Sequence, residues 1–122
     1  GPFIQYTYAR IQSVLRKAAD SGVVPQEIDI HISISEKEQE LIKLIAKLPD
    51  VVKEAGVTYS PALLANYSYD LAKEFNQFYH DFSILKEEKL TLKNFRLLLA
   101  KECAVAIQNA MGMLGIEMPD RM

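Results

Sequence analysis

Residues 59–82 read YSPALLANYSYDLAKEFNQFYHDF, and their pattern predicts a long helix. Ser60 is a typical N-cap residue, and Pro61 suits the first helical position because its fixed φ is helical and its missing N–H has no partner there. Apolar side chains then recur every three or four residues and share one face. They are Leu63, Leu64, Tyr67, Leu71, Phe75 and Phe78. Because a helix with one apolar face must pack against other elements, the stretch indicates an all-α fold.

The same periodicity predicts a first helix from Phe3 to about Asp20, with Pro2 in its first turn and Gly22 at its C-terminus. A wheel of 100° per residue divides this helix into two sides. The side predicted to face the core holds Phe3, Ile4, Tyr8, Ile11, Val14, Leu15 and Ala18. The outer side holds Tyr6, Arg10, Ser13, Arg16 and Lys17. Tyr6 and Arg10 are four positions apart and are therefore neighbours on the outer side.

A second helix is predicted to begin after Ser35, because Glu38 three residues later completes a capping-box signature. Its predicted buried stripe is Leu41, Ile42, Ile45 and Leu48. Proline interrupts this helix, so a further short helix is expected from Pro49, stopped by Gly56.

The last predicted helix runs from a Thr91 cap to about Leu114, with Gly115 as its C′ residue. Its apolar positions recur with helical spacing: Phe95, Leu98, Leu99, Cys103, Ala106 and Ile107. Residues 23–34 break the helical period at Pro25 and alternate strictly from Ile28 to Ile34, which indicates an extended linker, or an edge packed on helices. Together the segments predict an all-α helical bundle of four to five helices.

The composition fits one globular domain over residues 1–122, with 49% hydrophobic residues and 25% charged residues. The longest apolar runs are far shorter than the ~20 residues that a membrane span needs, so no membrane association is expected. The single cysteine, Cys103, cannot form an internal disulfide, which favours a reducing, cytoplasmic compartment. The net charge of -2 means that any nucleic-acid site must be a local basic patch.

Signatures of catalysis and metal binding are missing from the sequence. There is no glycine-rich phosphate loop, no serine elbow and no zinc-type spacing. The two histidines, His31 and His80, lie in different segments, so no metal site is expected. Cys103 lies among apolar helical neighbours and is interpreted as a small buried hydrophobe.

The outer group of Tyr6, Arg10 and Arg16 fits a binding surface, with Tyr79 from FNQFYHDF as a possible second wall. Aromatic rings stack on unpaired bases, and arginine contacts phosphates or base edges. The alternative is that these tyrosines only pack at the rim of the core. A helical protein-interaction module predicts exposed Leu, Ile and Met instead, and a purely structural bundle predicts that these residues scatter.

Three motifs, in order along the chain, resemble the C-terminal anticodon-binding domain (DALR type) of arginyl-tRNA synthetase. They are GPFIQYTYARIQSVLRKA at 1–18, LLANYSYDLAKEFNQFYHDFSIL at 63–85 and GMLGIEMPDRM at 112–122. Ser68 stands where that family often has a larger apolar residue, which is a change in packing. Glycyl-tRNA synthetase β-subunits carry a related domain, but the opening motif and the terminal methionine favour arginine.

The resemblance implies that this domain holds the anticodon loop of tRNA(Arg), in which the middle base is C. A separate catalytic domain of a class I arginine–tRNA ligase, absent from residues 1–122, would bind ATP and arginine. No cofactor is expected in this domain, no catalytic residue is assigned to it, and a monomer is expected. The anticodon-contacting positions that the resemblance implies are Tyr6, Arg10, Arg16, Tyr79 and Met122. Lys17 and Asn76 are secondary candidates.

Overall fold

The structure is a computed structural model that describes residues 2–23 and 34–121. It contains five helices: α1 (Pro2–Asp20), α2 (Glu36–Ala46), α3 (Leu48–Thr58), α4 (Ala62–Asp81) and α5 (Leu90–Met113). The described residues contain no strand, so the predicted all-α bundle is confirmed. The predicted linker or edge at 23–34 lies almost wholly outside the described residues.

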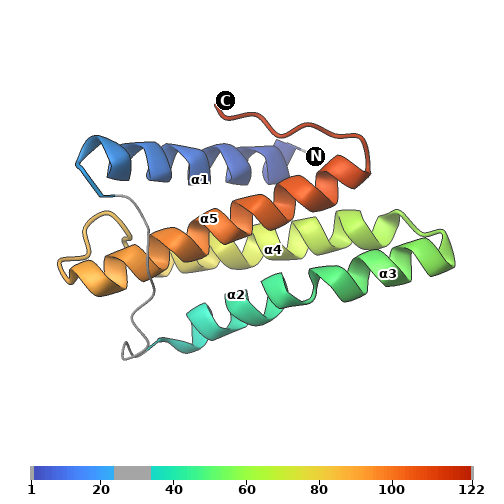
Figure 1. Cartoon of the computed structure of the whole chain (residues 1–122), viewed down its shortest axis with the longest axis horizontal. Coiled ribbons are helices and arrows are strands. Elements are labelled where there is room, and N and C mark those ends of the chain that lie inside the picture. Colours follow the sequence, from blue (N-terminus) through green and yellow to red (C-terminus); the bar gives the residue numbers. More distant parts are fainter. Residues whose placement is uncertain (1, 24–33, 122) are drawn as a thin grey trace.

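Helices α4 and α5 form the centre of the bundle (Figure 1). Helix α1 covers one side of this pair, and α2 and α3 follow each other along the opposite side. Both α4 and α5 contact every other helix, whereas α1 contacts only those two. The surface of α1 is therefore set by partners that are distant in the sequence.

A single residue, Lys47, separates α2 from α3 and serves as C-cap of one and N-cap of the other. Pro49 lies in the first turn of α3, where its missing N–H prevents one continuous helix. The predicted end at Gly56 is wrong, because glycine only weakens a helix interior. Tyr59 ends α3 instead, in the left-handed conformation with φ 53°.

The two glycines predicted as C-terminal caps are confirmed. Gly22 and Gly115 adopt φ of 85° and 77°, a region that glycine enters without strain. After α5, the Gly115 N–H donates to Gly112 O at 2.9 Å and the Ile116 N–H donates to Met111 O at 3.0 Å. These two bonds form a Schellman motif, which turns the chain sharply. The tail that follows runs back over α1 (Figure 1).

The predicted N-caps have mixed outcomes. The capping box of Ser35 and Glu38 is present at the start of α2. Pro61 occupies the N-cap of α4, and no side chain makes a cap hydrogen bond there, so the predicted role of Ser60 is wrong. Helix α5 begins one residue before Thr91 with Lys89 at its N-cap, so the threonine cap is also wrong.

The predicted apolar faces form one core, with two errors at their margins. Every predicted core position of α4 and α5 is buried or partly buried, and so are six of the seven on α1. Phe3 is 42% exposed because it lies at the edge of the apolar side of α1, where its ring packs on the Tyr69 ring at 5.4 Å. Ile42 is 39% exposed and borders an apolar groove between α2 and α5.

Candidate functional site

The residues predicted on the outer side of α1 do lie on its surface. The exposed fraction of Tyr6 is 58%, Arg10 and Lys17 are exposed, and Arg16 is partly exposed. Tyr6 and Arg10 are four positions apart and are therefore neighbours on the helix surface, whereas Arg16, six positions after Arg10, lies about 120° farther around the outer side of α1.

Arg10 lies between α1 and α4, against a flat aromatic surface. Its Cζ lies 4.7 Å from the centroid of the Tyr79 ring, a cation–π contact worth about 0.5–1 kcal/mol at an exposed site. Its Nη1 donates a hydrogen bond to Asn76 Oδ1 at 2.6 Å. The two contacts fix the guanidinium plane and leave most of its five N–H donors free of protein partners in the described chain.

A pocket of about 490 Å³ opens beside α1. Its lining residues are Tyr6, Ala9, Arg10, Ser13, Arg16 and Arg121. Three guanidinium groups thus line one pocket, and none of the described residues in its wall carries a carboxylate. Within residues 2–23 and 34–121, none of the three forms an ion pair. The pocket therefore has a strongly positive wall although the chain carries a net charge of -2.

The tail after α5 forms one wall of this pocket. Arg16 Nη1 donates to the Asp120 backbone carbonyl at 3.1 Å, which holds the tail against α1. Arg121 follows directly and reaches the pocket that Tyr6 and Arg10 line. The C-terminal segment and the first helix, far apart in the sequence, therefore build one site.

A second pocket, of about 370 Å³, lies in the seam between α1 and the end of α4. It is lined by Arg10, Val14, Tyr79, His80, Ser83, Ile84 and Leu85. Arg10 lines both pockets and is the residue that they share. We call the two pockets together the Arg10 surface.

Of the residues singled out from the sequence, the structure brings Tyr6, Arg10, Arg16 and Tyr79 together at the Arg10 surface. Asn76 lines neither pocket but accepts a hydrogen bond from Arg10. Lys17 is exposed and lines neither pocket. Met122 lies outside the described residues. A purely structural bundle predicts scattered positions, and the four residues are not scattered.

Sequence reasoning missed two residues of this site. Arg121 is a basic residue next to the predicted Met122, and that adjacency was a usable signal. Thr7 is 2% exposed and accepts a hydrogen bond from Asn76 Nδ2 at 2.7 Å. It falls in the middle of the buried side of the α1 wheel, where only apolar residues were considered.

The described residues hold no group of His, Cys, Asp and Glu arranged to bind a metal ion. Cys103 is fully buried, as expected, and burial raises the pKa of its thiol far above the usual range, with a further rise from Glu102. A thiol of this kind is a poor nucleophile at neutral pH. The Arg10 surface offers donors, positive charge and aromatic faces, which suit binding of an anionic, base-bearing ligand.

No helix in the described ranges combines the length and apolar character needed to cross a membrane. One other concave surface stands out. An almost wholly apolar groove of about 320 Å³ separates α2 from α5, lined by Ile42, Ile45, Ala46, Phe95, Leu98, Leu99 and Glu102.

Comparison with known proteins finds close relatives. The sequence model of a family described as the DALR anticodon binding domain matches residues 4–122. Over its whole length the chain is 61% identical to proteins named arginine–tRNA ligase from Parabacteroides distasonis and Bacteroides thetaiotaomicron. It spans about a fifth of their length, 21% in each case.

A solved structure has the same fold. The arginyl-tRNA synthetase of Thermus thermophilus superposes with a TM-score of 0.87 at 27% identity, covering 100% of this chain and 21% of that one. The resemblance read from the three sequence motifs is thereby confirmed.

Proposed function

This chain belongs to the DALR anticodon binding domain family, and from that premise we propose that it binds the anticodon loop of tRNA(Arg) as the C-terminal domain of a cytoplasmic arginine–tRNA ligase. In this proposal a separate catalytic domain binds ATP and arginine, and the described helices supply only recognition. The relatives named above are arginine ligases, which supports arginine over the glycyl-tRNA synthetase alternative.

The observation that carries the proposal is the convergence of arginine and tyrosine on the Arg10 surface. Tyr6 is 58% exposed, which leaves its ring open to an unstacked base, and Tyr79 is 37% exposed and carries the Arg10 guanidinium over its ring. Arg16 and Arg121 supply positive charge for the phosphates between those bases. Met122, next to Arg121, remains a predicted contact.

Arg10 is the residue best placed to select a base. Its guanidinium only donates hydrogen bonds, and cytosine presents two acceptors, N3 and O2, on its pairing edge. Uracil presents an N3–H donor instead of the N3 acceptor, so this donor would face an N–H donor of the arginine. A fixed guanidinium therefore favours C over U at the middle anticodon position.

The alternative of a helical protein-interaction module has one observation in its favour, the apolar groove between α2 and α5. The groove and the Arg10 surface share no lining residue, so a substitution can separate the two functions. Ile42→Lys should leave RNA binding unchanged. A loss of RNA binding in Ile42→Lys equal to that in Arg10→Ala would argue against the Arg10 surface as the RNA site.

The proposal is tested by titrating the chain with two RNA hairpins that carry the anticodon stem and loop of an arginine tRNA. The hairpins differ only in the middle anticodon base, C or U. Wild type should prefer C, and Arg10→Ala should weaken binding to the C hairpin by roughly tenfold or more, the effect of losing hydrogen bonds to a charged group. Equal binding of both hairpins by wild type, or full preference retained by Arg10→Ala, would contradict it. The same comparison with the full-length ligase extends the test to intact tRNA.

A further inference from the structure

The Arg10 guanidinium stands at the end of a chain of hydrogen bonds that begins in the first turn of α1. The Thr7 hydroxyl donates to the Phe3 carbonyl at 2.9 Å. Asn76 Nδ2 donates to Thr7 Oγ1 at 2.7 Å and to the Ala72 carbonyl at 2.9 Å. Asn76 Oδ1 then accepts from Arg10 Nη1 at 2.6 Å.

Each bond in this chain fixes the direction of the next. The single hydroxyl proton of Thr7 is given to the Phe3 carbonyl, so Thr7 Oγ1 can only accept from Asn76. The Ala72 carbonyl can also only accept, so the side-chain NH₂ of Asn76 must face both groups. Its Oδ1 is thereby turned toward Arg10. A reversed amide would set its oxygen against the Ala72 carbonyl oxygen and its NH₂ against the Arg10 donor.

We infer that Asn76 and Thr7 are positioning residues for Arg10 and that neither contacts RNA. The inference rests on the proposed function and refines it, since Asn76 was expected among the secondary RNA contacts. Thr7 is 2% exposed and cannot reach a ligand. Asn76 is partly buried, and its NH₂ and its oxygen are already engaged within the protein.

The consequence for binding is a guanidinium that is oriented before the ligand arrives. Asn76 holds one edge of Arg10 while the Tyr79 ring lies under its face. A side chain held in this way loses less rotamer freedom on binding, so its hydrogen bonds discriminate between bases more sharply. Thr7 sets the orientation of Asn76 and so acts on the RNA only through two other residues.

The test compares Thr7→Val with Thr7→Ser, using the two hairpins that differ at the middle anticodon base. Valine keeps the shape but removes the hydroxyl acceptor, and serine keeps the hydroxyl. Thr7→Val should lower the preference for the C hairpin by about fivefold, the effect of one neutral hydrogen bond, while Thr7→Ser should keep it. Equal preferences in the two variants would overturn the inference.

A double-mutant cycle separates positioning from a general loss of structure. If Thr7 acts through Arg10, then Thr7→Val should have no further effect on RNA binding in an Arg10→Ala background. An equal loss in both backgrounds would overturn the inference. Asn76→Ala, at a partly exposed position, gives the same cycle should Thr7→Val fail to fold.

A second measurement needs no RNA and so distinguishes failure of this inference from failure of the proposed function. Rotation of the Arg10 guanidinium about its Nε–Cζ bond can be followed by NMR in the free chain. It should be faster in Thr7→Val and Asn76→Ala than in wild type and Thr7→Ser. Equal rates in all four proteins would overturn the positioning role, whether or not the chain binds RNA.

Discussion

Arg96 Nη2 lies 3.6 Å from Glu38 Oε1, and the two side chains are only 8% and 1% exposed. This buried ion pair links the first turn of α2 to α5. Arg96 also lies 4.6 Å from the centroid of the Phe82 ring and 3.4 Å from Glu87 Oε2. Glu38 Oε1 also accepts a hydrogen bond from the Ser35 hydroxyl at 2.8 Å. One carboxylate therefore takes part in the N-cap of α2 and in the buried ion pair with α5.

Arg96→Ala should lower the free energy of unfolding by about 3–5 kcal/mol, because it leaves the Glu38 charge buried without a counterion. Urea denaturation at neutral pH measures the change. The double variant Glu38→Gln with Arg96→Met, which removes both charges and keeps a polar capping atom, should recover most of the loss. A double variant as unstable as Arg96→Ala would show that the ion pair itself is the main stabilising contact.

Two glycine substitutions should have opposite effects on stability. Apart from the adjacent backbone, no atom lies within 4 Å of a Cβ built on Gly56 or on Gly115, so the backbone conformation decides the effect. Gly56→Ala, within α3, should stabilise the chain by about 0.5–1 kcal/mol. Gly115→Ala, at φ 77°, should destabilise it by about 1–2 kcal/mol. Thermal unfolding of the two variants checks both predictions. A change of Tm in the same direction for both variants would contradict the argument.

Stability should fall between pH 10 and 12 through Tyr67. Burial, with a smaller contribution from Cys103, raises the pKa of Tyr67 to about 12, against an ordinary value of 10.0. The folded chain thus holds the phenol proton more tightly than the unfolded chain, so the stabilisation is full below pH 10 and is lost as the pH rises through 12. The neutral hydroxyl donates to the Leu44 carbonyl at 2.8 Å.

Tyr67→Phe is the control for this pH dependence. It should cost about 1 kcal/mol at pH 7 through the lost hydrogen bond, and its denaturation midpoint should fall less steeply from pH 10 to 12 than that of wild type. Parallel curves for the two proteins would rule out Tyr67 as the titrating group.

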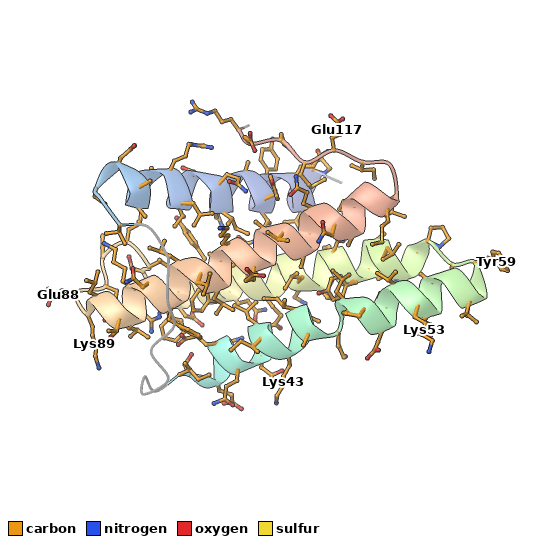
Figure 2. The ribbon with its side chains drawn as sticks, in the orientation of Figure 1. Lys43, Lys53, Tyr59, Glu88, Lys89 and Glu117 are labelled. Atoms are coloured by element: carbon orange, nitrogen blue, oxygen red, sulfur yellow. The ribbon has the colours of Figure 1, made fainter. Side chains whose placement is uncertain are left out.

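RNA binding should depend strongly on salt, and the dependence should be traceable to individual arginines. For a single-stranded ligand, each phosphate contact contributes about 0.7 to the slope of log K against log salt concentration. Arg16→Gln and Arg121→Gln should each reduce the slope by about that amount. Figure 2 shows Lys53 on the outer edge of α3, across the bundle from α1, so Lys53→Gln is the matched control. An equal reduction in Lys53→Gln would indicate non-specific attraction.

The sequence was sufficient for the helices and the faces they bury, because both follow from local periodicity and turn residues. The Ser35 capping box and the Gly115 cap are examples, since each depends on neighbours within a few positions. The start of α5 was less predictable, because Lys89 begins it without a side-chain cap. Phe3 was misplaced because it lies at the edge of the apolar side of α1, where a wheel does not show how much of the ring a partner helix covers.

The site could be predicted only in part for a related reason. Tyr6, Arg10 and Arg16 lie on the outer side of α1, which periodicity reveals. The contact of Arg10 with Tyr79 and Asn76 depends on the register between α1 and α4, and no local pattern encodes that register. Thr7 is a polar residue buried because of its partner, and its role becomes visible only once Asn76 is placed beside it.

Helix α1 touches α4 and α5 but neither of the two helices that follow it in the sequence. Its docking must therefore close a long loop, and loop closure of this kind slows folding. Helices α2 to α5 can pack together by closing shorter loops, so we expect α1 to pack onto them last. The surface that presents Arg10 would then be the final part of the described bundle to form and the first to open, with faster hydrogen exchange in α1 than in α4 and α5, the helices that it packs against.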